Sequence, residues 1–263
     1  MQKVELEIDA SGIARVTLNR PEVHNAFDEH VIQSLIDIFD QVSSNDKVRV
    51  MILQAKGKSF SAGADLNWMQ KMANYAFSEN KEDAQQLALM LNKLYTLNKP
   101  TIARVQGAAF GGAVGLVACC DIAVGSKLSK FCLSEVKLGL IPATISPYVI
   151  QAVGLREAKR LFMTAEVISS RRARRLGLLN ETVSEEDLDK TIDIIIGDIL
   201  KNGPVAVAKA KALALEVAEL PINDSLLDKT SEAIAHIRVS DEGQEGLHAF
   251  LEKRKANWIT QND

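Results

Sequence analysis

The chain has little net charge, and this excludes some classes of protein. Its 263 residues carry a formal charge of −3, which gives no broad attraction to nucleic acid or to an anionic membrane. Residues 105–120 lack charge, but the segment is short, rich in glycine and flanked by Arg104 and Asp121, so it is not a membrane span. The first residues alternate charged and apolar side chains as a strand does, not as a signal peptide does. We therefore expect a cytoplasmic protein without a membrane or nucleic-acid partner.

Cysteine is also scarce. Cys119, Cys120 and Cys132 lie in apolar runs, and their spacing suits neither a disulfide framework nor a zinc site. We expect reduced, buried thiols. No P-loop or dinucleotide fingerprint is present. Three histidines show no spacing for a metal or for a Ser/His/Asp system: His30, His236 and His248.

Strand and helix patterns alternate along most of the chain, which predicts an α/β fold. The expected strands are 4–8, 13–18, 48–53, 101–105, 122–124 and 131–133. The expected helices are 28–42, 65–72, 81–97, 111–119, 148–152, 156–163, 170–176 and 188–200. Residues 204–257 have no strand signal and break near Pro221 and Asp241. We expect a core over residues 1–203 and a helical C-terminal region over 204–263.

Two glycine-rich stretches are the most informative feature. Phe-Ser-Ala-Gly-Ala-Asp-Leu at 60–66 and Gly-Ala-Ala-Phe-Gly-Gly-Ala-Val-Gly-Leu at 107–116 each follow an apolar run and lead into a helical pattern. Each presents main-chain N–H groups without a bulky side chain in the way. Two such donors aimed at one point stabilise a carbonyl oxygen that becomes negative. By spacing alone, both could equally be turns before helices.

Several blocks in order resemble the crotonase superfamily, the enoyl-CoA hydratase/isomerase group. They are Leu-Asn-Arg-Pro-Glu-Val-His-Asn-Ala-Phe at 18–27, Ser-Ala-Gly-Ala-Asp-Leu at 61–66, Lys-Pro-Thr-Ile-Ala-Arg-Val-Gln-Gly at 99–107, Cys-Asp-Ile at 120–122 and Phe-Cys-Leu-Ser-Glu-Val-Lys-Leu-Gly-Leu-Ile-Pro at 131–142. The resemblance implies a spiral of ββα units, C-terminal helices that mediate trimers or hexamers, and an acyl-CoA substrate. Details at 64–69, 117–122 and 143–149 look most like bacterial methylglutaconyl-CoA and carboxygeranoyl-CoA hydratases.

The resemblance also implies roles for particular residues. The N–H groups of Ala64 and Gly112 would hold the thioester oxygen, and Glu135, expected at the end of a short strand, would transfer the proton. Coenzyme A is then part of the substrate, and no metal or redox cofactor is required. Further substrate or CoA contacts carry over to His24, Ala26, Ala62, Asp65, Leu66 and Pro142. An ordinary N-cap is an equal alternative for Asp65.

Gly115 departs from the pattern, because two-carboxylate hydratases have a second Glu there. Three alternatives remain open: Glu135 acts alone on water, another group such as Ser146 or Tyr148 substitutes, or the reaction is a double-bond shift. A hydratase is favoured, an isomerase is the alternative, and a paralogue that only binds CoA or RNA is a third.

Other features have simpler interpretations. Arg-Arg-Ala-Arg-Arg at 171–175 could bind phosphate, RNA or a substrate carboxylate, but a solvated helix face with ion pairs to residues such as Glu166 is favoured. Asp121 is expected to be a buried structural carboxylate. Trp68, Met69 and Met72 are expected in the core or the acyl pocket.

Overall fold

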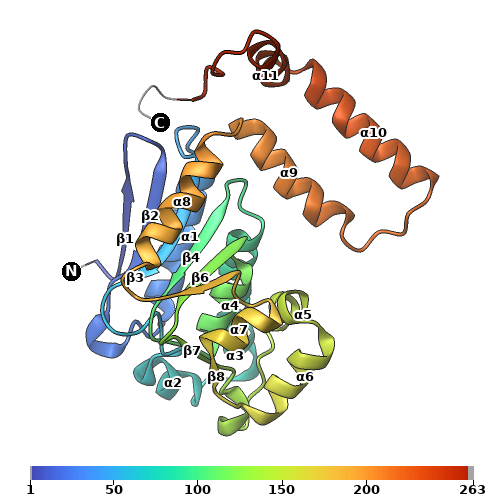
Figure 1. Cartoon of the computed structure of the whole chain (residues 1–263). Helices are drawn as coiled ribbons and strands as arrows, with labels where there is room; N and C mark the ends of the chain where they lie inside the picture. Colours follow the sequence, from blue (N-terminus) through green and yellow to red (C-terminus); the bar gives the residue numbers. More distant parts are fainter. Residues whose placement is uncertain (1, 260–263) are drawn as a thin grey trace. The chain divides into compact units, whose positions relative to one another are not determined.

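A computed structural model describes residues 2–259 (Figure 1). The chain forms two compact units, one of residues 1–97 with 101–192 and the other of residues 98–100 with 193–263. The first unit contains the sheets and all the expected site residues. Within residues 2–259, every helix is too short or too polar to cross a membrane.

The first unit is built on a six-stranded sheet with the order β1-β2-β3-β4-β6-β9. Its strands are β1 (Val4–Ile8), β2 (Ile13–Leu18), β3 (Val50–Ala55), β4 (Thr101–Val105), β6 (Ile122–Ser126) and β9 (Glu181–Val183). β1 and β2 form an antiparallel hairpin, and every later pairing is parallel. Gly12 turns the hairpin at φ 83°, where a side chain would collide with the Lys47 carbonyl.

A second, three-stranded sheet pairs β5 (Ala108–Phe110) with β7 (Lys130–Cys132) and β7 with β8 (Ile168–Ser169). The helices of the first unit are α1 (Glu29–Ser44), α2 (Leu66–Met72), α3 (Phe77–Tyr95), α4 (Gly112–Cys119), α5 (Ser146–Val153), α6 (Leu155–Thr164) and α7 (Ser170–Leu176). Two 3₁₀ turns are η1 (Pro21–Val23) and η2 (Glu135–Leu138).

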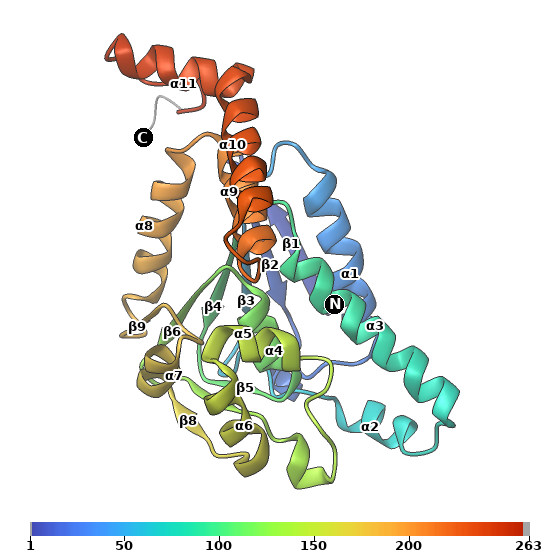
Figure 2. The ribbon, with the colours of Figure 1, turned by 90° about the vertical axis from the view of Figure 1, so that its right-hand side faces the viewer.

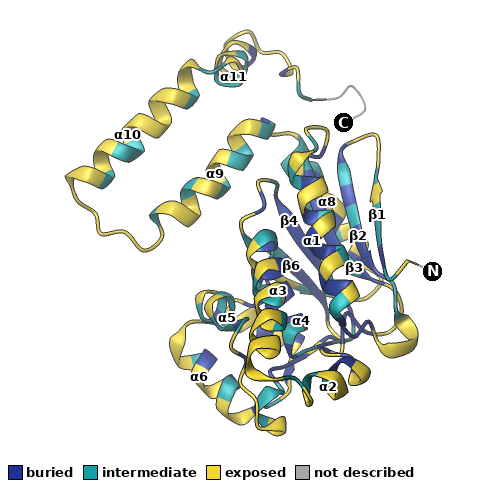
Figure 3. Cartoon of the chain, turned by 180° about the vertical axis from the view of Figure 1, so that it is seen from behind, coloured by how far each residue is buried: buried dark blue, intermediate teal, exposed yellow. Residues whose placement is uncertain are grey.

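The core of the first unit lies between the large sheet and the helices. Strands β2, β3 and β4 are almost entirely buried, as Figure 3 shows. Helices α1 and α3 lie side by side (Figure 2), and the apolar stripe of α1 is buried from Val31 to Val42. Asp28 begins α1 as its N-cap by accepting the Val31 N–H at 2.9 Å.

Helix α8 (Leu188–Leu200) leads from the first unit into the second. The second unit continues with α9 (Pro204–Val217), α10 (Asp224–Val239) and α11 (Asp241–Leu251). These are the three helices expected after Pro204. Within its described part this unit contains no strand, and neither α9 nor α10 has a buried residue.

The sequence pattern misplaces some elements. Strand β3 begins at Val50 rather than Val48, because the Val48 N–H donates to Asn45 in the turn that follows α1. Helix α3 begins at Phe77 rather than Lys81, because the Glu79 carboxylate accepts the Ala76 N–H at 2.7 Å. Strands β5, β8 and β9 have at most three residues each, too few for an alternating pattern. Glu135 begins the 3₁₀ turn η2 and does not end a strand, as was expected.

Candidate active site

The segment 60–64 lies between two other segments that are distant in sequence. On one side, Ala62 N–H donates to the His24 carbonyl at 2.9 Å, and Phe27 forms a bridge with Ala64. On the other, Ser61 forms a bridge with Ala109 of β5. The same strand β5 pairs with β7, which leads to Glu135. These pairings bring the two glycine-rich stretches and the carboxylate together.

The direction of the Ala64 N–H is set by the Phe27 bridge. Phe27 N–H donates to the Gly63 carbonyl at 2.7 Å, and Asp65 N–H donates to the Phe27 carbonyl at 2.7 Å. In a trans peptide the C=O and N–H point in opposite directions, so the Ala64 N–H points away from Phe27. Gly63 adopts φ 95°, and a Cβ there would lie 3.0 Å from the Phe110 carbonyl.

Gly112 supplies the second donor. It is the first residue of α4, so its N–H has no partner within the helix, and the helix dipole favours negative charge there. Gly111, the N-cap residue, adopts φ 55° and donates its own N–H to the Cys132 carbonyl at 2.8 Å. Within residues 2–259, neither the Ala64 nor the Gly112 N–H has a hydrogen-bond acceptor.

Glu135 is a half-buried carboxylate beside these donors. A Cβ on Gly111 would lie 3.5 Å from Glu135 Oε1, so the bare glycine backbone lies against the carboxylate. Glu135 Oε2 is buried and is the one such side-chain atom without a partner in the described part of the chain. Burial raises the pKa of Glu135 above its ordinary value of 4.5. A carboxyl with a raised pKa holds its proton more readily than a surface carboxylate does, which suits a group that both takes up and returns a proton.

Ala64, Gly112 and Glu135 line one cavity of about 340 Å³, which is open to solvent. Its other lining residues come mostly from α2, α3 and the segment after η2: Phe27, Trp68, Met72, Asn80, Asp83, Ala84, Leu87, Leu140, Ile141, Pro142, Ala143, Thr144 and Ile145. Most are apolar. Trp68 Nε1 donates to Asp83 at 3.0 Å, and burial raises the pKa of Asp83. The sequence predicts all three of Trp68, Met69 and Met72 in the core or the acyl pocket; Trp68 and Met72 line the cavity, whereas Met69 lies outside the lining.

Ile145 occupies the space beside Gly115. A Cβ on Gly115 would overlap Ile145 Cγ2 and lie 2.8 Å from Ile145 Cβ. The position at which the resemblance implies a second Glu in two-carboxylate hydratases is therefore closed by an aliphatic side chain that is 1% exposed. The sequence indicates that Gly115 departs from the family pattern but gives no sign of its contact with Ile145, because the two residues are 30 positions apart and no local pattern links them.

Ser146 and Tyr148 lie outside the cavity lining. Ser146 Oγ donates to the Ala143 carbonyl at 2.8 Å, just before the start of its own helix. Tyr148 packs against Tyr95, with ring centroids 5.0 Å apart, and lines a different cavity. Neither residue replaces the missing carboxylate in this structure, so this alternative from the sequence is not supported.

Of the other candidate contacts, Pro142 lines the cavity, whereas the remaining five lie outside the lining: His24, Ala26, Ala62, Asp65 and Leu66. Leu66 is 76% exposed, and His24 Nδ1 lies 3.2 Å from Ser59 Oγ. Asp65 has the capping role: its Oδ1 accepts the Asn67 N–H at 2.8 Å, and its Oδ2 pairs with Arg20 at 2.9 Å. Contacts of these five residues with CoA stay predictions.

The structure also shows the surroundings of the basic run at 171–175, Asp121 and the cysteines. Arg172 of the basic run pairs with Glu157 and Glu166, as a solvated helix face does. Asp121 accepts two hydrogen bonds from Thr101 but is exposed, so the expected burial is wrong. Cys119 and Cys132 are buried, Cys120 is partly buried, and none is in a disulfide. The described residues contain no cluster of side chains that could hold a metal ion.

Comparison with known proteins identifies the family of the chain. The enoyl-CoA hydratase/isomerase family profile matches residues 9–261. A crotonyl-CoA hydratase of Syntrophomonas wolfei is 34% identical over 94% of this chain and 95% of its own. A trans-2-decenoyl-[acyl-carrier-protein] isomerase of Streptococcus mutans is 28% identical over 93% and 94%. The solved enoyl-CoA hydratase of Shewanella pealeana is 46% identical over 97% and 96%, with a TM-score of 0.94.

The chain therefore belongs to the enoyl-CoA hydratase/isomerase family and has the crotonase fold. Both the α/β fold and the superfamily resemblance read from the sequence are confirmed. The likeness to methylglutaconyl-CoA and carboxygeranoyl-CoA hydratases is a finer statement and stays a prediction.

Proposed function

We propose that the protein is an enoyl-CoA hydratase, which adds water across the α,β double bond of an acyl-CoA thioester or removes it. The thioester oxygen accepts hydrogen bonds from the Ala64 and Gly112 N–H groups. Coenzyme A belongs to the substrate, and the steps below use no other cofactor. The family membership supports the substrate class, and the cavity geometry supports the roles of the residues.

In the hydration direction, Glu135 begins as a carboxylate. It takes a proton from water while the water oxygen bonds to the β-carbon, and the π electrons move toward the thioester oxygen. The two N–H groups stabilise the resulting enolate. Glu135 then returns the proton to the α-carbon, which gives the 3-hydroxyacyl thioester. One carboxylate thus performs both transfers, on one face of the substrate.

One observation carries this proposal. Two main-chain N–H groups without an acceptor and a half-buried carboxylate with a partnerless oxygen line the same cavity. Losing one oxyanion donor typically slows an enzyme by about 100- to 1,000-fold, so the paired donors account for a large part of the catalysis.

The test is incubation with a 2-enoyl-CoA while the absorbance of the conjugated thioester is followed. We expect the absorbance to fall as water adds. We expect Glu135→Gln to lower kcat by at least about 100-fold, because the amide cannot accept and return the proton. Unchanged turnover in Glu135→Gln would remove this residue from the mechanism. No turnover of any enoyl-CoA by the native protein would favour a paralogue that only binds CoA or RNA.

An enoyl-CoA isomerase is the second candidate, and Ile145 favours it. Because Ile145 closes the space beside Gly115, that position offers no carboxylate to hold water; the other carboxyl in the lining, Asp83, belongs to α3 and accepts the Trp68 Nε1–H. In the isomerase reaction, Glu135 takes a proton from the α-carbon of a 3-enoyl-CoA and delivers it to the γ-carbon. A 3-enoyl-CoA would then gain the conjugated absorbance, while a 2-enoyl-CoA would not lose it.

The acyl group is proposed on the resemblance alone. A branched or carboxylated chain such as 3-methylglutaconyl-CoA is the first candidate, which would place the enzyme in leucine breakdown. A panel of straight, branched and carboxylated 2-enoyl-CoA thioesters compares the kcat/KM values. Equal or higher kcat/KM for straight chains such as crotonyl-CoA would reject this candidate.

A further inference from the structure

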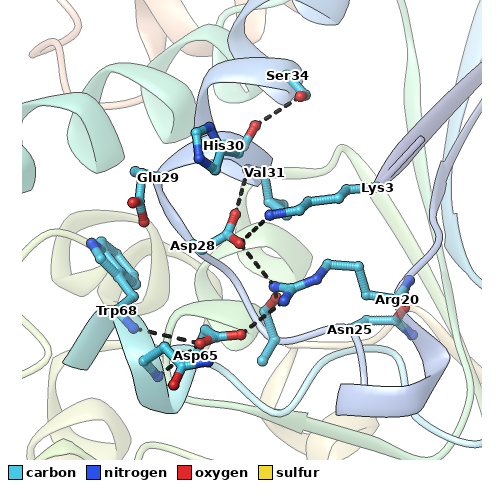
Figure 4. A network of polar contacts seen from close by, with 12 residues as sticks. Lys3, Arg20, Asn25, Asp28, Glu29, His30, Val31, Ser34, Asp65 and Trp68 are labelled. Carbon is cyan, nitrogen blue, oxygen red and sulfur yellow. Dashed lines mark hydrogen bonds and ion pairs between the residues drawn. The ribbon is translucent and has the colours of Figure 1, made fainter. Parts of the chain in front are cut away.

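Arg20 lies at the centre of a network of charged groups, shown in Figure 4. The network lies next to the segment 60–65 that carries the Ala64 N–H, the donor loop. Its Nη2 pairs with Asp65 Oδ2 at 2.9 Å, and its Nη1 lies 3.3 Å from Asp28 Oδ2. The same Nη1 donates to the Ala26 carbonyl at 2.7 Å. Lys3 adds a second positive charge at Asp28. The guanidinium therefore connects two helix N-caps and a main-chain carbonyl.

These groups flank the bridge that orients the Ala64 N–H. Ala26 precedes Phe27, and Asp65 follows Ala64. Arg20 thus contacts the chain neighbour of each partner in the Phe27–Ala64 bridge. A second contact fixes the same loop, since Asn25 Oδ1 accepts the Arg20 N–H at 2.8 Å. A shift of either segment would lengthen the hydrogen bond between Phe27 N–H and the Gly63 carbonyl, and would turn the Ala64 N–H with it.

The charged groups of this network are largely buried, so salt screens their attraction less than it does on an open surface. The side chain of Arg20 is 14% exposed, and those of Asp28 and Asp65 are 11% and 7% exposed. Burial alone would raise the pKa of Asp65, but the Asn67 N–H, Arg20 and the Trp68 N–H hold it below its ordinary value. Burial alone would likewise raise the pKa of Asp28, but Lys3, the Val31 N–H and Arg20 hold it below its ordinary value, so both carboxylates are charged at neutral pH. A planar guanidinium reaches three acceptors in fixed directions, which a lysine ammonium cannot do.

We propose that Arg20 is a positioning residue for the oxyanion site: it aims the Ala64 N–H by holding Ala26 and Asp65 in register. Arg20 lies outside the cavity lining, so it acts through these residues and not on the substrate. This inference rests on the proposed function, because it assumes that Ala64 holds the thioester oxygen. The inference does not depend on whether the enzyme is a hydratase or an isomerase.

The test compares Arg20→Lys and Arg20→Gln with matched changes at Arg172. Arg172 also bridges two carboxylates, Glu157 and Glu166, but neither of them is next in sequence to Phe27 or Ala64. We expect the Arg20 variants to lower kcat by about 10- to 100-fold, less than the loss of a whole oxyanion donor. KM should change far less than kcat. The Arg172 variants should keep the native kcat.

A spectroscopic measurement separates positioning from general destabilisation. The probe is 4-(dimethylamino)cinnamoyl-CoA, whose long-wavelength absorption moves to the red when its carbonyl oxygen accepts stronger hydrogen bonds. We expect the red shift on binding to shrink in both Arg20 variants and to be unchanged in the Arg172 variants. Arg20 variants that lose stability but keep the native kcat and red shift would overturn the proposal.

A milder change covers the case in which the Arg20 variants do not fold. Asp65→Asn keeps an oxygen to cap α2 but removes the charge that pairs with Arg20. It should shrink the red shift in the same direction, and an unchanged shift would contradict the proposal. If the native protein turns over no enoyl-CoA, the proposed function fails instead, which is a different outcome from an effect confined to the variants.

Discussion

Replacing Gly115 by alanine is expected to destabilise the protein through a clash with Ile145. The added Cβ would overlap Ile145 Cγ2 and lie 2.8 Å from Ile145 Cβ, and Ile145 is 1% exposed. Overpacking a close-packed core costs about 1–3 kcal/mol. The better helix propensity of alanine offsets about 1 kcal/mol of this cost. Because the overlap is severe, we expect a net loss of about 1–2 kcal/mol.

The partner variant gives the coupling between the two positions. Ile145→Ala alone should cost about 2–5 kcal/mol, because it leaves a cavity in the core. In the double variant, the methyl group at position 115 occupies part of the space that Ile145 vacates. The double variant should therefore be more stable than the sum of the two single changes predicts, by about 1–3 kcal/mol. A contact of 2.8 Å with the Cβ at position 145 remains, so the relief is incomplete.

Urea unfolding of the four proteins measures this cycle, with Gly197→Ala as the control. Gly197 is also a helical glycine, but a Cβ there meets nothing within 4 Å. The control should be neutral or stabilising, by up to about 1 kcal/mol. Additive effects at 115 and 145, within about 0.5 kcal/mol, would refute the conclusion that Ile145 fills the space of the missing carboxylate.

Four more predictions concern the site and the assembly. Because burial raises the pKa of Glu135, its charged form destabilises the folded state above pH 4.5. Glu135→Gln should therefore be more stable than the native protein at pH 8. Urea unfolding across pH should show this advantage shrink as the pH falls toward 4.5. In the proposed hydration Glu135 acts as a carboxylate, so kcat/KM should rise with pH through an apparent pKa above 4.5. A flat profile over the acidic range would contradict this role. Gly63→Ala should lower the free energy of unfolding by about 1–2 kcal/mol and should lower kcat, since Gly63 has φ 95°. A variant with the native stability and the native kcat would argue against a role of Gly63 in orienting the donor loop. The C-terminal helices should form trimers or hexamers, because they expose large apolar side chains such as Leu227, Val239 and Phe250; a monomer by light scattering at micromolar concentration would exclude this.

Local chemistry was sufficient to predict most of the fold. The apolar stripe of α1, the N-caps at Asp28 and Asp65 and the Gly111-Gly112 start of α4 each depend on residues within one or two helical turns. The short strands of the second sheet depend instead on partners far along the chain. Their two or three residues are strands because β5, β7 and β8 pair with one another.

The candidate site was predicted partly from residues and partly from resemblance. The glycines at 63, 111 and 112 mark where the main chain must be bare, and they identify the two donor segments. The sequence did not show that Glu135 begins a 3₁₀ turn with one oxygen buried and partnerless. It also gave no signal for Arg20, because Asp65 is 45 residues away and joins the nearby Ala26 and Asp28 around the guanidinium only when distant segments pair.

The sequence by itself determined which segments could become helices and strands, where the backbone lacks side chains, and that position 115 has no carboxylate. These properties follow from the residues themselves and their near neighbours. Only the tertiary structure decided that Ile145 fills the space beside Gly115 and that Arg20 holds the loop of Ala64. Both depend on contacts across 30 or more residues, and such contacts form only when packing places distant segments within a few ångströms of each other.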